Sequence, residues 1–396
     1  MRLHVLRAAA MVGVMAALWL LTSGLHPEVH AQVDEPGRQI FLPVITRDHT
    51  PGWHWGEAYT VTVSMRTSEP PLAAIDRGGR PHLFWHDRAT DGHIHHIYLA
   101  DDGWQELLPS QGLAGDSSLT NQPLVDQAGR IHLFWFHRME PPGNQPYRFQ
   151  YAIFDGARWT EPEEIIRLLY NTSKAWVRLD QHDQPHLGII TGFLNWRALL
   201  LTLQETWQPI GDFRLPTNAS VLWPDAESGA HLYGSDSNVL KYWRWLNGAT
   251  AIEQTLGEGR LLTRSIAFDS ADNMHLYWKA NVNVDGSPVS LLHHQCVDEQ
   301  RRLSVVSHHG GPGSVREVVS ASEQGTLFAL AWQESARKRI MLWDGCTPGA
   351  TATIPEEAQQ ITLVRAVAVS STPRKVCVFM QQRDAAIYTV RCAELD

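Results

Sequence analysis

A short segment recurs along the chain and restricts the fold more than any other feature of the sequence. Its first copy, Ile75 to Asp87, is an apolar run, a glycine-rich turn and a second apolar run that begins near His82. Two such runs around a short turn are typical of an antiparallel hairpin. Four further copies keep the histidine, at Leu124 to His137, Leu179 to Leu187, Asp225 to Tyr233 and Phe268 to Trp278.

Two altered copies follow, Val319 to Phe328 and Val369 to Phe379, in which Thr326 and Lys375 replace the histidine. The equivalent positions of the seven copies are 50, 54, 45, 44, 51 and 49 residues apart. A period of this length accommodates four strands, the unit of a β-propeller blade. We therefore expect an all-β fold, a seven-bladed β-propeller of four-stranded antiparallel blades.

The two ends of the repeated region predict how the ring closes. The last copy supplies three strands, and no fourth strand follows them before Asp396. The β-branched run Tyr59 to Val63 precedes the first blade without partners of its own. Pairing this run with the last blade would leave neither end with an unpaired sheet edge. We expect residues 53–396 to form one propeller domain, closed by this N-terminal strand.

The N-terminus has the pattern of an export signal. Arg2 and Arg7 precede the uncharged apolar run Ala8 to Leu21, and Val29 to Ala31 supplies small residues for cleavage. The apolar run is short for a membrane-spanning helix, which needs about 20 residues. We expect residues 1–31 to be a signal peptide, with a retained N-terminal anchor as the alternative, and residues 32–52 to be a linker. The protein is then secreted or held at the cell surface.

The charge of the chain argues against nucleic acid as a partner. The formal net charge is −9, and removal of residues 1–31, which hold two arginines and one glutamate, changes it to −10. The chain also lacks blocks of lysine and arginine. We expect the protein to contact a membrane only through an uncleaved N-terminal segment. We also expect it to be a monomer and to bind no cofactor.

All four cysteines lie in the last third of the chain, at positions 296, 346, 377 and 392. An even number in an exported chain indicates disulfides, with three connectivities open. Cys377 and Cys392 flank a turn and face each other in the expected hairpin, so we prefer that bridge. Cys296 and Cys346 follow the third strands of neighbouring blades and can pair only if their Cα atoms approach within ~7 Å.

The repeated polar and aromatic residues have structural explanations. The histidines occupy equivalent slots, one per blade, so a ring separates them, and we expect each to bond a neighbouring strand or turn. The aspartates that open the hairpin turns favour bonds to backbone amides two residues on. We expect the tryptophans at positions 104, 159 and 207 to pack as wedges between blades. His93 and His95 have the spacing of a metal pair on a strand, but we assign no metal site.

The repeats resemble the Asp-box, or BNR, repeats of sialidase-like propellers. The resemblance rests on the turns Asp101 to Trp104 and Asp155 to Trp159, each an aspartate and glycine turn with a trailing tryptophan. The usual serine before the aspartate is absent from both, and the Arg-Ile-Pro motif of the family is absent near the first blade. The resemblance implies a propeller fold. In a sialidase it would also imply an arginine triad, a Tyr/Glu nucleophile pair and an Asp acid/base, none of which we can assign here.

Functional residues are expected in the loops between the second and third strands, because loops on a rigid scaffold converge at one mouth of the ring. The ligand-binding candidates are Arg88, His137, Arg138, Lys279, Arg337 and Arg383. The arginines among them suit an anionic or sugar ligand. Glycoside hydrolysis would need two facing carboxylates about 5 to 10 Å apart, for which Asp87 and Glu334 are candidates by loop position.

Two functions from different classes remain open. The first is a secreted or surface-tethered module that binds a carbohydrate or an extracellular protein without catalysis. The alternative is a glycoside hydrolase of the sialidase-like type. A structural scaffold of the cell envelope becomes the third if the N-terminal segment is retained.

Overall fold

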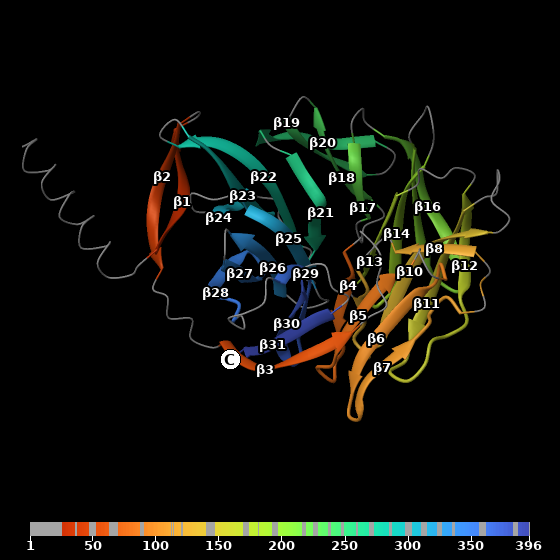
Figure 1. The fold of residues 1–396 in the computed structure, drawn as a ribbon. Coiled ribbons are helices and arrows are strands. Elements are labelled where there is room, and N and C mark those ends of the chain that lie inside the picture. Colours follow the sequence, from red (N-terminus) through yellow and green to blue (C-terminus); the bar gives the residue numbers. More distant parts are fainter. Residues whose placement is uncertain are drawn as a thin grey trace, which may run out of the picture.

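The fold consists of antiparallel β-sheets. A computed structural model describes residues 26–35, 38–46, 53–62, 70–87, 91–111, 113, 115–119, 122–139, 147–168, 174–180, 182–191, 197–215, 219–224, 229–236, 239–246, 249–258, 260–268, 273–284, 287–297, 303–309, 315–322, 327–334, 337–355, 362–382 and 387–395. The strands of these residues form seven sheets, which follow one another around the molecule in chain order (Figure 1).

The first three sheets come from the N-terminal half of the chain. The first contains β4 (Leu72–Ile75), β5 (Pro81–His86), β6 (Ile94–Ala100) and β7 (Gly103–Leu107). The second contains β8 (Gly115–Leu119), β9 (Leu124–Val125), β10 (Ile131–Met139), β11 (Tyr147–Phe154) and β12 (Glu163–Leu168). The third contains β13 (Lys174–Leu179), β14 (Pro185–Thr191), β15 (Arg197–Leu203) and β16 (Trp207–Arg214).

The other four sheets follow in the same manner. The fourth contains β17 (Ala219–Pro224), β18 (Ala230–Asp236), β19 (Val239–Leu246) and β20 (Ala249–Glu258). The fifth contains β21 (Arg260–Phe268), β22 (Met274–Val284), β23 (Ser287–Val297) and β24 (Leu303–His309), extended by β1 (His26–Glu35) and β2 (Arg38–Thr46). The sixth contains β25 (Val315–Ser322), β26 (Leu327–Glu334), β27 (Arg337–Asp344) and β28 (Thr347–Thr353). The seventh contains β29 (Thr362–Ser371), β30 (Arg374–Gln382), β31 (Ile387–Leu395) and β3 (Trp53–Thr62).

Burial falls from the first strand of a sheet to the fourth. In the first sheet every residue of β4 and β5 is buried, whereas no residue of β7 is fully buried. The inner strands are apolar on both faces because both faces contact neighbouring sheets, and the outer strand meets solvent. Continuous apolar runs such as Leu83 to Trp85 are the sequence signature of a strand covered on two sides.

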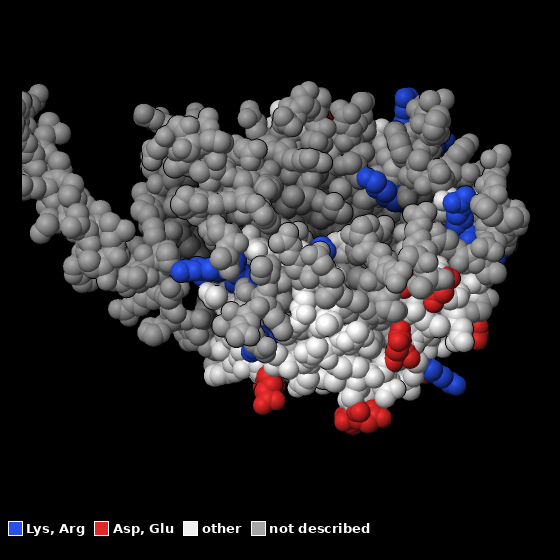
Figure 2. Space-filling model, viewed as in Figure 1, with Lys and Arg blue, Asp and Glu red and all other residues white. Residues whose placement is uncertain are grey.

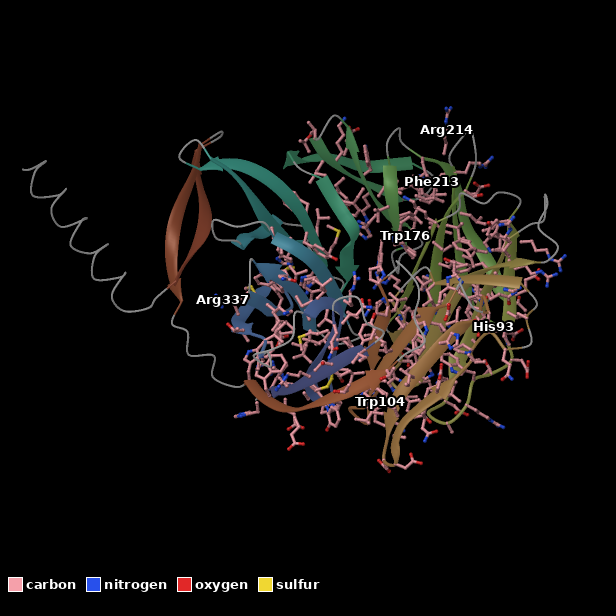
Figure 3. All side chains as sticks on the ribbon, viewed as in Figure 1. His93, Trp104, Trp176, Phe213, Arg214 and Arg337 are labelled. Atoms are coloured by element: carbon pink, nitrogen blue, oxygen red, sulfur yellow. A yellow bond between two sulfur atoms is a disulfide. The ribbon has the colours of Figure 1, made fainter. Side chains whose placement is uncertain are left out.

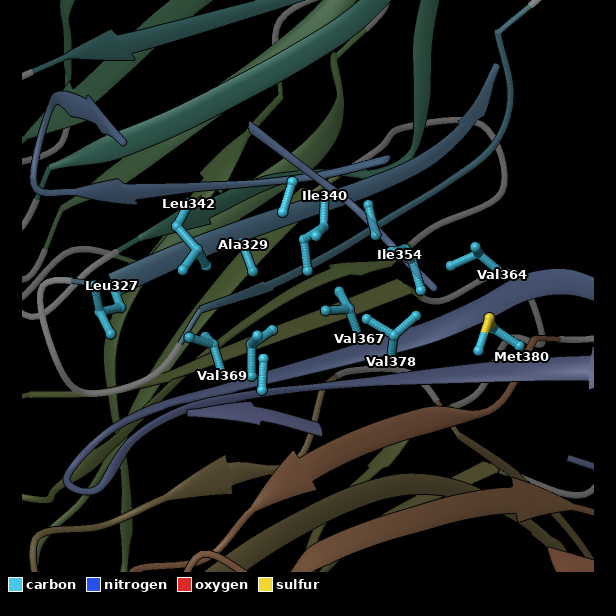
Figure 4. Close-up of a cluster of buried hydrophobic side chains, with 14 residues drawn as sticks. Leu327, Ala329, Ile340, Leu342, Ile354, Val364, Val367, Val369, Val378 and Met380 are labelled. Atoms are coloured by element: carbon cyan, nitrogen blue, oxygen red, sulfur yellow. The ribbon is translucent and has the colours of Figure 1, made fainter. Parts of the chain in front are cut away.

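Seven clusters of buried side chains lie between successive sheets and join them into a ring. Six of them connect each sheet to the next, from the first and second to the sixth and seventh. Figure 4 shows the cluster between the sixth and seventh sheets, where Leu327 and Ile340 face Val367 and Val378. The seventh cluster places Leu83 and Trp85 of the first sheet against Phe379 of the last. The protein is therefore an all-β β-propeller of small antiparallel sheets.

The predicted pairing of the N-terminal strand with the last sheet is confirmed. β3 pairs with β31 in antiparallel register from Trp53↔Leu395 to Thr62↔Ile387. The strand supplies the outermost position of the seventh sheet. Val61 belongs to the cluster that joins the last sheet to the first, so the pairing lies at the junction between the two ends of the array.

Two sheets depart from the expected four strands. The inner strand of the second sheet is divided into β8 and β9, which both pair with β10. The fifth sheet has six strands, because β1 pairs with β24 and β2 with β1. The segment expected as a linker therefore contains β2, and β1 runs across the expected cleavage point after Ala31. The signal peptide and the linker remain predictions.

The preferred disulfide forms, and so does the second one, whose condition on the Cα distance is met. Cys377 and Cys392 are directly opposite each other on β30 and β31. Cys296 on β23 joins Cys346, which follows β27, with the Cα atoms 5.4 Å apart. This second bridge links the fifth sheet to the sixth. Within the part of the chain that the structure describes, no helix has the length and hydropathy needed to cross a bilayer.

Candidate functional surface

The hairpin turns of the first three sheets share one polar arrangement. In the second sheet, Asp126 Oδ1 accepts the backbone N–H of Arg130 at 2.7 Å, and Asp126 Oδ2 accepts the Arg130 side chain at 2.6 Å. The same Oδ2 lies 3.1 Å from Nε2 of His132. The turns opened by Asp76 and Asp180 have the same aspartate contacts with the backbone and with the histidine six residues on. These three aspartates therefore form turns as predicted, but the backbone amide that all three accept is four residues on, and only Asp180 also accepts the amide two residues on. Asp225 and Asp269 lie outside the described residues.

The electrostatics of these turns favour ionised aspartates. Burial alone would raise the pKa of Asp126, but hydrogen bonds from His132 and Arg130 outweigh it and lower the pKa to about 2. Asp76 has a pKa of about 2 for the same reason, with His82 and Arg80 as its partners. The ionised carboxylates of Asp76 and Asp126 therefore stabilise the turns that they open.

The second ring nitrogen of the repeated histidines contacts the next strand of the same sheet. His132 Nδ1 lies 2.7 Å from the Tyr151 hydroxyl, and His231 Nδ1 lies 3.0 Å from the Tyr242 hydroxyl. His82 contacts His96 in the equivalent way, at 2.8 Å. The structural role predicted for these histidines is confirmed.

The predicted tryptophan wedges are also confirmed. Trp104, Trp159 and Trp207 each pack against the cluster between their own sheet and the preceding one. Trp207 contacts the ring of Tyr151 edge-on, with centroids 6.0 Å apart and planes at 88°. In the sixth sheet the corresponding turn, between β27 and β28, holds Cys346, which forms the disulfide with Cys296.

The two catalytic candidates lie in sheets that are not neighbours. Asp87 belongs to the first sheet and its side chain is fully buried, while its backbone holds the turn that ends at Gly92 through a 2.9 Å bond. Glu334 ends β26 in the sixth sheet, paired with Arg337. The seventh sheet stands between the two in the ring. Figure 3 shows Arg337 and His93, from the same two hairpins, at opposite sides of the molecule.

The ligand-binding candidates are distributed in the same way. His137 is buried and its Nδ1 lies 3.1 Å from Ser117 Oγ, whereas the adjacent Arg138 is half-buried. Lys279 lies on β22, paired with Leu292, and Arg337 is exposed at the start of β27. Arg88 and Arg383 lie outside the described residues. One pair of candidates is linked, since Ser117 N donates to Gly92 O at 2.9 Å and thereby connects the turn after Asp87 to His137.

The histidines with metal-pair spacing have protein partners. His95 lies 2.8 Å from Glu106 through Nδ1 and 3.2 Å from Asp91 through Nε2. His93 Nδ1 is 3.3 Å from Ser110 Oγ. Among the described residues, no group of three or more His, Cys, Asp or Glu side chains is arranged to hold a metal ion.

An aromatic surface that we did not predict lies on β3, the outermost strand of the seventh sheet. The Trp53 and Trp55 rings stack with centroids 5.8 Å apart and planes at 24°. Both are half-buried, because one side of the pair packs against the cluster shown in Figure 4. Glu57 is exposed two residues after Trp55, whereas the register places His54 and Tyr59 on the other face of the strand. We call Trp53, Trp55 and Glu57 the β3 surface.

The sequence contained a signal for this surface. The pattern Trp-His-Trp places two indoles on the same side of a strand, and the outermost strand of a sheet is less covered by the neighbouring sheet than the inner strands are, as β7 shows. The described lower part of the molecule, which includes β3, carries scattered rather than clustered charges (Figure 2). Aromatic rings, and not a charged patch, therefore distinguish this surface.

The chain matches no family model and no curated protein, so the sialidase-like family is not confirmed. Solved structures resemble it at low identity. The polysaccharide lyase Uly1 is 8% identical over 92% of this chain and 94% of its own, with a TM-score of 0.49. The BP39L lectin from Burkholderia pseudomallei is 12% identical over 82% and 95% (TM-score 0.48). The β-propeller domain of the Trilobed protease from Pyrococcus furiosus is 12% identical over 81% and 95% (TM-score 0.48). With TM-scores below 0.5, these likenesses carry no argument about fold or activity.

Proposed function

We propose that this protein is an exported β-propeller that binds carbohydrate through the β3 surface without catalysing a reaction. The observation that supports the proposal is the stacked, half-buried pair of Trp53 and Trp55 on an outermost strand. Indole faces are broad, rigid and apolar, and the C–H faces of sugar rings stack on such surfaces. Glu57, exposed two residues after Trp55, supplies a polar group for hydroxyls. An extracellular protein ligand is the other occupant that this surface would accept.

The extracellular location is part of the proposal. Two disulfides are compatible with an oxidising compartment, as is the export signal expected for residues 1–31. Binding of ligands outside the cell suits a closed ring, because its rigid sheets hold surface side chains in place. The Asp155 turn supports the resemblance to Asp-box propellers, since Asp155 Oδ1 accepts the backbone N–H groups of Ala157 and Arg158, each at 2.9 Å.

We also propose that the ring has seven blades, one for each antiparallel sheet. Seven sheets and seven inter-sheet clusters support this number. Glycoside hydrolysis remains the alternative function. It would need a carboxylate pair other than one built on Asp87, whose side chain is buried.

A glycan array probed with the folded protein, followed by affinity measurement on the retained glycans, tests the proposal. Trp55→Ala should weaken binding about tenfold or more, since truncating an aromatic anchor costs more than about 1.4 kcal/mol. Trp207→Ala is the matched control, because it removes a tryptophan of similar burial from another part of the ring. Equal loss in both variants, or no glycan retained by the wild type, would contradict the proposal. A panel of fluorogenic glycosides run in parallel would reveal turnover and favour the alternative.

A further inference from the structure

A chain of hydrogen-bonding groups crosses from the second sheet into the first. Trp159 Nε1 lies 3.2 Å from His96 Nδ1, and His96 Nε2 lies 2.8 Å from His82 Nδ1. His82 Nε2 is 3.3 Å from Asp76 Oδ2, an electrostatic contact and not a hydrogen bond. Both imidazoles are fully buried. We call these four side chains the indole–imidazole relay.

The chemistry of the indole fixes the direction of the relay. An indole N–H can only donate, so His96 Nδ1 must accept its hydrogen bond. His96 is then the neutral tautomer with its proton on Nε2, and that proton is donated to His82 Nδ1. His82 in turn carries its proton on Nε2, facing the carboxylate of Asp76. Both tautomers are assigned from the donor and acceptor inventory, and the arrangement requires both rings to be neutral.

The groups around the relay oppose an additional charge. Arg80 is the nearest cation, held 2.6 Å from Asp76 and with its guanidinium 5.5 Å from the centre of the Tyr98 ring. The remaining neighbours are the rings of Tyr98, Phe84 and Phe154, which stack on or meet the edges of the imidazoles. Burial is the main cause that lowers the pKa of His96 well below its usual value; a proton on His82 would lower it further, and so does the charge of Arg80. Burial also lowers the pKa of His82, and Asp76 partly offsets this.

We propose that the relay is an acid-sensitive latch between the first two sheets, which releases Trp159 when the histidine pair takes up a proton. A proton added at His82 Nδ1 is donated to His96 Nε2, and Asp76 balances the charge. His96 must then carry its own proton on Nδ1, where it meets the N–H of Trp159. Two donors cannot bond each other, so the contact between the sheets opens.

The pH range follows from the direction of the shifts. The unfolded or opened chain binds protons near the ordinary histidine pKa of about 6.5, and the closed relay resists them. The latch is therefore closed above about pH 6.5. Its stability falls as the pH drops below that value. For each proton taken up on opening, the equilibrium constant for opening rises by up to about tenfold per pH unit.

The second sheet provides a built-in comparison. Its equivalent of His96 is Tyr151, whose hydroxyl lies 2.7 Å from His132 Nδ1. A hydroxyl both donates and accepts, so His132 can gain a proton without losing this bond. Trp207 packs on Tyr151 edge-on, and its Nε1 has no hydrogen-bond partner among the described groups. No donor clash can arise at this second junction.

The test exchanges these two residues in the full-length protein. Hydrogen exchange, expressed as protection factors to remove the intrinsic pH dependence, would be followed for the Trp159 and Trp207 turns between pH 7.5 and 5. In the wild type, the Trp159 turn should lose protection about tenfold or more, and the Trp207 turn should not. His96→Tyr should abolish that loss, and Tyr151→His should create one at Trp207. Unchanged protection at Trp159 in the wild type, or the same loss in His96→Tyr, would overturn the proposal.

A second measurement decides the case if a variant fails to fold. Side-chain 15N spectra of the wild type report the tautomer of each histidine. At pH 7.5, His96 should show an unprotonated Nδ1 and a protonated Nε2. The opposite tautomer, or a doubly protonated ring, would overturn the relay.

Discussion

At the scale of single residues, the polar side chains of the repeat form hydrogen bonds within the fold. Asp126 holds a backbone amide, an arginine and a histidine within one turn. A group with three such partners is costly to replace, because the buried His132 would be left without its acceptor. The repeat therefore records a structural requirement, and its recurrence alone gives no evidence of catalysis.

Asp126→Asn should destabilise the protein by about 1–3 kcal/mol at pH 7, because a charged acceptor of hydrogen bonds is lost. The folded pKa of about 2 lies below the ordinary value of 3.8, so the carboxylate stabilises the fold above about pH 4. That contribution disappears as the pH falls toward 2. Denaturant unfolding at pH 7 and melting between pH 5 and 2 would measure both effects.

The control for this variant is Asp212→Asn, which breaks an exposed ion pair with Arg197 and should cost less than about 1 kcal/mol. The wild type should lose stability more steeply in acid than Asp126→Asn does. Parallel curves for the two proteins would contradict the assignment of Asp126.

The roles of single residues could be predicted only where the repeat itself records them. The aspartate and histidine roles followed from their equivalent places in the repeat. The burial of Asp87 did not, because it depends on the second sheet, whose Ser117 bonds the turn at Gly92. Contacts of that kind join segments whose proximity the local sequence does not report.

At the scale of elements, the sequence predicted strands well where apolar runs were continuous. The apolar run expected to begin near His82 lies on β5. β8 was missed because Gly115–Leu119 is glycine, aspartate, two serines and leucine, which have little preference for strands apart from the leucine. Only its pairing with β10 makes it a strand. β1 was missed because its residues overlap the expected export signal.

The two disulfides act on different elements and predict different costs. Cys296–Cys346 joins two sheets and spans 50 residues, and Cys377–Cys392 lies within one hairpin and spans 15. In the loop-entropy model the longer span contributes about 1 kcal/mol more, on a total of about 3–4 kcal/mol each. The double variant Cys296→Ala with Cys346→Ala should therefore melt below Cys377→Ala with Cys392→Ala. The reverse order, measured by calorimetry, would show that the inter-sheet bridge is not the stronger constraint.

At the scale of the whole molecule, the central feature is a ring that the chain closes with its own first propeller strand. Sheets in a row would leave two outer faces exposed, and the cluster between the last sheet and the first covers both. The match between an unpaired strand at one end and a three-stranded sheet at the other was readable from the sequence. The same match places the Trp-His-Trp pattern on an outermost strand, so the β3 surface could also have been predicted from the sequence.

Closure can be tested by a crosslink between the two ends of the array. Thr60 on β3 is directly opposite Thr389 on β31, and paired Cα atoms in such strands lie within the range that a disulfide spans. The double variant Thr60→Cys with Thr389→Cys should form this bridge in the folded protein, detected as one peptide pair by mass spectrometry. Thr60→Cys with Thr255→Cys, which uses an exposed position on the fourth sheet, should form none. A folded protein without the bridge between positions 60 and 389, or with equal crosslinking in both variants, would contradict the closed ring.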